Sequence, residues 1–112
     1  MTYEEFTVEN LKRCEAFTGF NHKIDSWSES DWMTATMGEL GELANIVKKL
    51  NRFRDGIPGN TETKAQLLAD AEYELADVFI YLDLLARRLK MDMMAVVTRK
   101  FARTSAKIGY LQ

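Results

Sequence analysis

The stretch Asp70-Ala-Glu-Tyr-Glu-Leu-Ala-Asp-Val-Phe-Ile-Tyr-Leu-Asp-Leu-Leu85 decides the fold of this chain. Its apolar residues recur every three or four positions, which is typical of an amphipathic helix. Successive residues of a helix turn by about 100°, and four polar residues therefore share one narrow stripe: Asp70, Glu74, Asp77 and Tyr81. Carboxylates surrounded by apolar surface carry a large desolvation cost unless a cation or a donor lies beside them. The stripe therefore predicts half of a metal site.

The expected partner is upstream, in Met37-Gly-Glu-Leu-Gly-Glu-Leu43. Glu39 and Glu42 are three positions apart and share a helix face. Gly38 and Gly41 each cost up to about 1 kcal/mol relative to Ala inside a helix, and such departures from local rules are often functional. A missing Cβ lets another backbone or a phosphate come close. Taken alone, the stretch is equally compatible with glycines that serve helix packing and glutamates that face water.

The two acidic pairs together predict a divalent-cation site. Antiparallel helices pack about 8–10 Å apart, so Glu39 and Glu42 can converge with Glu74 and Asp77. Four hard oxygen ligands suit Mg²⁺ or Mn²⁺. A di-iron bundle needs Glu-x-x-His pairs, and the only histidine, His22, precedes all four acids. A zinc site needs more Cys and His than the one of each that this chain has.

Length and composition predict one all-α domain over residues 1–112. The chain is 46% hydrophobic and has one proline and almost no strand-like alternation. Because 15 Lys and Arg balance 17 Asp and Glu, nothing indicates a nucleic-acid or membrane partner. No apolar run approaches the roughly 18 residues of a membrane helix. A single cysteine, Cys14, and the absence of a signal-peptide pattern after Met1 favour the cytoplasm.

Capping and breaking residues predict four helices joined by short turns, the pattern of a helical bundle. The expected helices cover residues 3–19, 31 to 51 or 53, 61–90 and 92–109. The expected N-caps of the last three are Ser28 or Ser30, Thr61 and Asp92. Gly19 is expected to stop the first helix, and the segment Arg54–Asn60, with two glycines and the proline, breaks the second from the third.

At this point the sequence resembles the MazG-like, all-α nucleoside triphosphate pyrophosphohydrolases. That family has a Glu-x-x-Glu helix followed by a Glu-x-x-Asp helix, here Glu39–Glu42 and Glu74–Asp77. The flanking segments Gly38–Leu43 and Glu74–Tyr81 also match, and the resemblance covers about residues 27–108. It implies a four-helix bundle completed by oligomerisation, as a homodimer or a homotetramer. It also implies Mg²⁺-dependent hydrolysis of a nucleoside triphosphate between the α- and β-phosphates, to a monophosphate and pyrophosphate.

The resemblance further assigns roles to single residues. The four acids Glu39, Glu42, Glu74 and Asp77 are implied as the catalytic metal ligands. Tyr81 is implied to help hold the nucleotide, and Lys100 on the last helix to contact the phosphates. Where relatives carry an Asn one turn further on, this chain has Thr104.

The chemistry agrees with these residue types. Phosphoryl transfer mainly needs positioning and charge neutralisation, and Mg²⁺ bridges carboxylates to phosphate oxygens. A metal-bound water is easier to deprotonate, with Glu42 or Glu39 as its base. Lys48 or Lys49 would help to neutralise the phosphate tail. For Trp32 we expect packing in the core or at a dimer interface, with base stacking as the alternative.

Two other interpretations remain open. Within enzymes, the chain would be a phosphoribosyl-ATP pyrophosphatase, which has a related fold and another substrate. Outside enzymes, it would be a nucleotide-sensing or helical interaction module, or a nucleic-acid binder that uses its Arg and Lys edges. Tight nucleotide binding without pyrophosphate release would indicate a sensor, and steeply salt-dependent binding would indicate nucleic acid.

Overall fold

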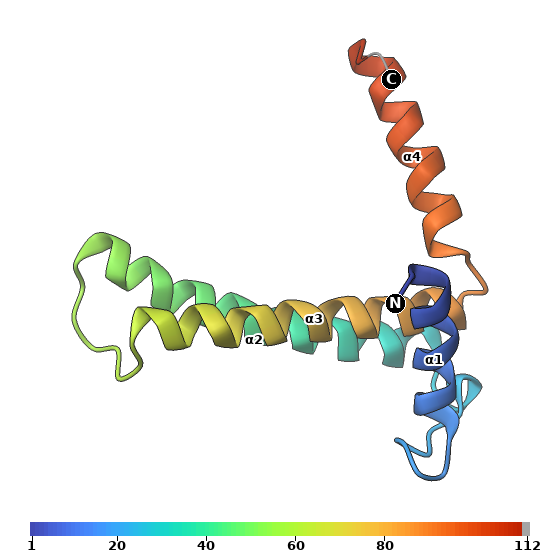
Figure 1. Cartoon of the computed structure of the whole chain (residues 1–112), viewed down its shortest axis with the longest axis horizontal. Coiled ribbons are helices and arrows are strands. Elements are labelled where there is room, and N and C mark those ends of the chain that lie inside the picture. Colours follow the sequence, from blue (N-terminus) through green and yellow to red (C-terminus); the bar gives the residue numbers. More distant parts are fainter. Residues whose placement is uncertain (111–112) are drawn as a thin grey trace.

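The protein is all-α, as the sequence predicts. The computed structural model describes residues 1–110, and these contain no strand. The elements in chain order are α1 (Tyr3–Glu15), the short 3₁₀ helix η1 (Ile24–Ser26), α2 (Glu29–Asp55), α3 (Lys64–Arg88) and α4 (Met93–Ile108). The long helices α2 and α3 form an antiparallel hairpin, α1 crosses the end of the hairpin away from its connecting loop, and α4 projects away from the other three (Figure 1). None of these helices is both long enough and apolar enough to cross a membrane.

Local signals set the bounds of α2 and α4. Ser28 caps α2 in a reciprocal capping box, because its hydroxyl accepts from the N–H of Asp31 and the Asp31 carboxylate accepts from the N–H of Ser28. The helix ends at Gly56, whose φ of 68° is left-handed. Asp92 caps α4, and Gly109 ends it with a φ of 77°. The predicted cap Asp92 and the predicted stop at Gly109 are confirmed.

Two predicted helix ends are wrong. The third helix is capped by Thr63, not Thr61, because Thr63 and Gln66 form the reciprocal pair of hydrogen bonds of a capping box. The first helix ends at Glu15 and not at Gly19. Gly19 lies instead in a turn that folds back onto α1, where an added Cβ would be 2.0 Å from the backbone oxygen of Arg13. Gly19 therefore permits a close backbone approach and does not end the helix.

The buried core lies where α1, η1, α2 and α3 meet. Its buried members are Cys14, Trp32, Leu84 and Leu85, with Ile24 and Tyr81 packed against them. Elsewhere much apolar surface remains exposed on one chain. On α4, Val97, Phe101 and Ile108 are all exposed, and this helix has no extensive packing against another helix within the described residues. The single chain therefore holds an antiparallel hairpin with two flanking helices, and not a closed bundle.

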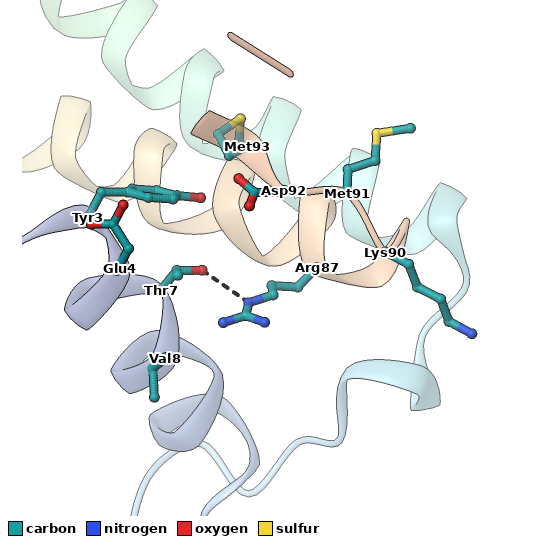
Figure 2. A pocket seen from close by; sticks show the side chains of 9 residues that line it. All are labelled: Tyr3, Glu4, Thr7, Val8, Arg87, Lys90, Met91, Asp92 and Met93. Atoms are coloured by element: carbon teal, nitrogen blue, oxygen red, sulfur yellow. Dashed lines mark hydrogen bonds between the residues drawn. The ribbon is translucent and has the colours of Figure 1, made fainter. Parts of the chain in front are cut away.

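A buried carboxylate fastens α1 to α3. Asp83 is fully buried and accepts hydrogen bonds from three α1 side chains: Tyr3 at 2.7 Å, Thr7 at 2.9 Å and Asn10 at 3.0 Å. Arg87 of α3 donates from Nε to the Thr7 hydroxyl at 3.0 Å, beside a cavity of about 530 Å³ between α1 and the α3–α4 turn (Figure 2). These hydrogen bonds hold α1 against α3, and α1 supplies part of the wall of the candidate site.

Candidate functional site

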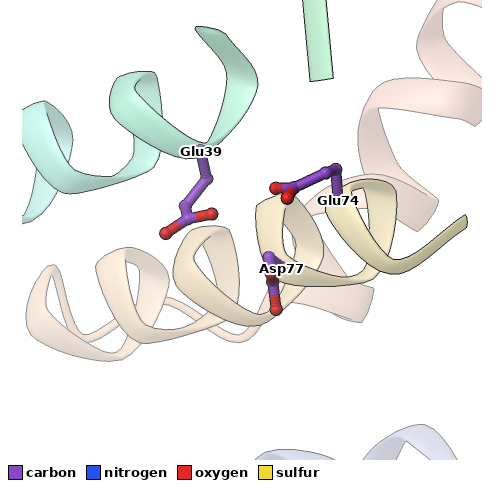
Figure 3. A group of neighbouring side chains, drawn as sticks. All are labelled: Glu39, Glu74 and Asp77. Atoms are coloured by element: carbon purple, nitrogen blue, oxygen red, sulfur yellow. The ribbon is translucent and has the colours of Figure 1, made fainter. Parts of the chain in front are cut away.

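Acidic side chains from α2 and α3 meet in the middle of the hairpin. Glu39, Glu74 and Asp77 are all half-buried, and each offers a carboxylate oxygen within 4.8 Å of the others (Figure 3). Glu42, one turn beyond Glu39 on α2, lies close enough for its charge to raise the pKa of both Glu39 and Glu74. The structure thus brings together the two acidic pairs that the sequence singled out. Their spacing of three residues on each helix is the local cause of this arrangement.

The electrostatics of this cluster favour a bound cation. Burial, then the charges of Glu42 and Asp77, raise the pKa of Glu39. Burial, then the contact with Glu42 and the neighbouring charges, raise the pKa of Glu74 in the same direction. One carboxylate oxygen of Glu74, Oε2, is buried and has no hydrogen-bond partner in residues 1–110. A cation among these oxygens would reduce the repulsion between the carboxylates and would give Oε2 of Glu74 a partner.

The donor set fits a hard divalent cation. All four side chains offer only carboxylate oxygens, which suit Mg²⁺ and Mn²⁺ better than zinc or copper. Glu42 is exposed and the other three side chains are half-buried, so a substrate phosphate can approach the carboxylates. The residues present therefore fit the ion that the sequence predicts.

An aromatic cavity of about 290 Å³ adjoins the carboxylates, and Asp77 lines it. Five of its lining residues are aromatic: Phe20, His22, Trp27, Trp32 and Tyr81. The ring centres of His22 and Trp27 are 4.4 Å apart, and those of Trp27 and Trp32 are 4.7 Å apart. The remaining lining residues are Arg13, Cys14, Ile80 and Leu84. The cavity thus offers flat apolar faces next to a group of carboxylates.

Trp32 serves the core and the cavity together. Only 2% of it is exposed, and its indole N–H donates to the backbone oxygen of Ile24 at 2.9 Å. The expected core packing of Trp32 is confirmed. Its presence in the cavity wall keeps the alternative, base stacking, as a prediction.

Tyr81 lies one turn after Asp77 on α3 and joins the cavity to the carboxylates. Burial is the main cause that raises its pKa, and the charges of Glu39 and Asp77 act in the same direction. The phenol therefore stays protonated at neutral pH and keeps its O–H as a donor toward a ligand.

The cationic residues predicted to bind phosphates are not gathered at this site in one chain. Lys48 is exposed on α2, and Lys49 forms an ion pair with Glu62 at 2.7 Å near the hairpin loop. Lys100 and Thr104 are exposed on α4, which projects away from the hairpin. Their contact with phosphate stays a prediction.

His22 and Arg13 are cavity residues that helical periodicity did not reveal. Arg13 reaches the cavity from the last turn of α1, and His22 reaches it because the chain after α1 turns back, with the N–H of His22 donating to the backbone oxygen of Cys14 at 2.8 Å. The usable signal was Gly19, whose lack of a Cβ permits this turn. A turn predicted at Gly19 would have placed the segment after α1 against the core.

The chain is 31% identical over 105 residues to the Homo sapiens protein dCTP pyrophosphatase 1. The match covers 86% of this chain and 55% of the human protein, so this chain spans about half the length of that relative. No family profile matches the chain. No solved structure matches it either.

Proposed function

We propose that this chain, which fits the MazG-like nucleoside triphosphate pyrophosphatase family in sequence and in its all-helical fold, is a nucleotide pyrophosphohydrolase. Its substrate would be a nucleoside or deoxynucleoside triphosphate, cleaved between the α- and β-phosphates to a monophosphate and pyrophosphate. One observation carries the proposal: the carboxylate cluster and the aromatic cavity adjoin, and Asp77 belongs to both. This pairing matches the two ends of a nucleotide, a polyanion and a flat base.

Glu39, Glu42, Glu74 and Asp77 would hold Mg²⁺ or Mn²⁺. When bound, the ion supplies positive charge that links the carboxylates to phosphate oxygens, and it makes a bound water easier to deprotonate. We assign acceptance of the attacking water's proton to a carboxylate of α2, either Glu39 or Glu42. Tyr81 would donate its phenolic O–H to the nucleotide, because its raised pKa keeps it protonated.

The aromatic cavity would take the base. Stacking of a base on an aromatic side chain contributes about 1–3 kcal/mol, and Trp27, Trp32 and His22 offer faces for it. A volume of about 290 Å³ is large enough for a single base. The human relative is named for dCTP, so dCTP is the first substrate to test.

A second copy of the chain would complete the site. The apolar face of α4, with Val97, Phe101 and Ile108, is left exposed by its own chain, and surfaces of this kind mark interfaces. Symmetric packing of two copies would place each α4 against the partner's hairpin. Lys100, with Thr104 beside it, would then approach the partner's carboxylates as phosphate ligands.

The test is a panel of the common NTPs and dNTPs, with pyrophosphate release measured with and without Mg²⁺. We expect release that needs the divalent ion and that is lost in Glu74→Gln and Asp77→Asn, without a fall in Tm. Glu72→Gln is the matched control, because Glu72 is exposed on the same helix and outside the cluster. Pyrophosphate release that persists in both cluster variants, or that no nucleotide supports, contradicts the proposal.

A further inference from the structure

One wall of the aromatic cavity is made by a segment outside any helix. Trp27 lies in the link between η1 and α2, and 36% of it is exposed, whereas Trp32 is locked in the core. The ring of Trp27 faces both His22 and Trp32. Its position therefore depends on what holds the backbone of this link.

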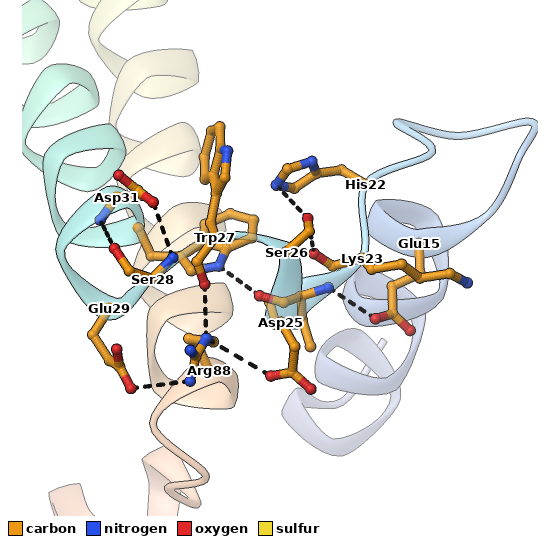
Figure 4. A network of polar contacts seen from close by, with 12 residues as sticks. Glu15, His22, Lys23, Asp25, Ser26, Trp27, Ser28, Glu29, Asp31 and Arg88 are labelled. Carbon is orange, nitrogen blue, oxygen red and sulfur yellow. Dashed lines mark hydrogen bonds and ion pairs between the residues drawn. The ribbon is translucent and has the colours of Figure 1, made fainter.

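Arg88, in the last turn of α3, holds that backbone (Figure 4). Its Nε donates to the backbone oxygen of Trp27 at 2.8 Å, and its Nη1 donates to a carboxylate oxygen of Glu29 at 3.0 Å. The same Nε lies 3.7 Å from a carboxylate oxygen of Asp25 in η1. One guanidinium thus contacts η1, the link and the first turn of α2, and its planar fork fixes their relative positions.

These contacts serve geometry more than stability. The side chains of Asp25 and Glu29 are 75% and 55% exposed, and exposed ion pairs contribute little to folding. The Arg88 side chain is only 20% exposed, and its charge-assisted bond to the Trp27 carbonyl is of the stronger kind. What this arrangement determines is where the Trp27 backbone lies.

We infer that Arg88 is a positioning residue for the base-binding cavity. It holds Trp27 against His22 and Trp32, so that the aromatic wall exists before a nucleotide arrives. Without it, the link must be ordered at the cost of binding free energy. Arg88 is not among the residues that line the cavity or form the carboxylate cluster, so its loss should weaken binding of the base and leave the chemical step intact. This inference rests on the proposed function.

The chain carries its own reporter for this role. Both of its tryptophans line the cavity, so intrinsic fluorescence and its quenching by acrylamide follow the wall directly, without any nucleotide. The variants are Arg88→Gln and Arg88→Lys. Arg54→Gln is the matched control, because it removes the same charge from an arginine that also pairs with a carboxylate, at the far end of α2.

For Arg88→Gln we expect tryptophan fluorescence that acrylamide quenches more readily. We expect the Kd of dCMP and the KM of dCTP to rise about tenfold, the loss typical of one charge-assisted hydrogen bond. The kcat for dCTP and the Kd of inorganic pyrophosphate, both measured with Mg²⁺, should not change. Arg88→Lys, which keeps the charge but has no fork, should fall between wild type and Arg88→Gln, and Arg54→Gln should match wild type.

Several outcomes would overturn the inference. Unchanged quenching together with an unchanged Kd of dCMP removes the positioning role. A fall in kcat at constant KM, or equal weakening of dCMP and pyrophosphate, assigns Arg88 to chemistry or to general folding instead. If Arg88→Gln does not fold, Arg88→Lys decides on the same readouts. A wild type that releases no pyrophosphate from any nucleotide refutes the proposed function, whereas the quenching comparison still tests the wall.

Discussion

Gly19 shows how one missing methyl group shapes the site. An added Cβ would lie 2.0 Å from the backbone oxygen of Arg13, and backbone cannot move aside as a flexible side chain can. We expect Gly19→Ala to lower the free energy of unfolding by about 1–3 kcal/mol, as overpacking does, and to shift His22. Urea unfolding measures the first effect and tryptophan fluorescence the second. Thr18→Ala, at the exposed neighbouring position, should stay within about 0.5 kcal/mol of wild type, and equal stability of both variants contradicts the turn described here.

Tyr3 links α1 to Asp83 in a way that alkaline pH can test. Burial, with the hydrogen bond to Asp83, raises the pKa of Tyr3 to about 12. Because the folded pKa lies above the unfolded value near 10, the protonated phenol stabilises the fold. This contribution is complete below about pH 10 and is lost as the pH rises toward about 12.

Thermal unfolding between pH 8 and 12 checks this sign. The Tm of wild type should fall more steeply with pH than the Tm of Tyr3→Phe, which has no phenol to ionise at this position. Tyr73→Phe is the control, because Tyr73 is largely exposed. The Tm of this variant should fall with pH as steeply as the Tm of wild type. If Tm falls equally with pH in wild type and in Tyr3→Phe, ionisation of the Tyr3 phenol is not coupled to unfolding.

Residues of the site differ in how far the sequence could predict them. Glu39, Glu74 and Asp77 were identifiable because a local spacing of three places pairs of acids on one helix face. Asp83 and Arg88 were not, because their partners are far away in the chain: Tyr3 is 80 residues from Asp83, and Trp27 is 61 from Arg88. Helical periodicity indicates which face of a helix is polar, but it does not indicate partners that are distant in the sequence.

At the scale of elements, the two glycines of α2 offer a direct test. A Cβ added at Gly38 or Gly41 would meet no atom within 4 Å, so no close contact within the described chain explains them. We expect Gly38→Ala and Gly41→Ala each to raise the free energy of unfolding by up to about 1 kcal/mol through helix propensity. Ala44→Gly, at an exposed position of the same helix, should lower it by a similar amount. A loss of stability in either alanine variant would indicate that another copy's backbone approaches this turn, and a selective loss of turnover would indicate a phosphate.

Helix ends were predictable where one residue decides them. Asp92 and Gly109 bound α4 as expected, because a cap and a left-handed glycine act locally. The start of α3 was missed because Thr61 and Thr63 are equally good caps by residue type. Gln66 decides between them, since it lies three residues after Thr63 and closes a capping box. Lys49 likewise pairs with Glu62 across the hairpin loop, which the sequence of either helix alone does not indicate.

At the scale of the whole molecule, one chain is too extended to be a finished bundle. Its radius of gyration is 17.6 Å, whereas a compact domain of this length has about 13 Å. The excess comes from the long hairpin and from α4, which projects away from it (Figure 1). On α4, Val97, Phe101 and Ile108 form an exposed apolar face, but an amphipathic pattern does not say which surface covers that face. What covers this face is therefore the part of the fold that a single sequence leaves open.

Subunit complementation tests whether a second copy supplies that surface and a site residue. Asp77→Asn removes a cluster carboxylate, and Lys100→Gln removes the proposed phosphate ligand on α4; we expect each homodimer to be inactive. If Lys100 serves the partner's carboxylates, a mixed dimer has one complete site, formed by the acids of the Lys100→Gln chain and the Lys100 of the Asp77→Asn chain. Random exchange of two-fold dimers should then restore roughly a quarter of the wild-type pyrophosphate release per chain.

The alternative arrangement gives the opposite result. If Lys100 acts on the carboxylates of its own chain, no mixed dimer contains an intact site, and the mixture stays as inactive as its parents. The control mixture pairs Asp77→Asn with Glu74→Gln, two variants damaged in the same cluster, and it should show no recovery in either case. Co-purification of chains that carry different affinity tags verifies that the subunits have exchanged, and light scattering after size-exclusion chromatography verifies that the mixture is dimeric. A wild type that remains monomeric, with a radius of gyration near 17.6 Å in solution, would refute the shared site and leave the carboxylate cluster to act without α4.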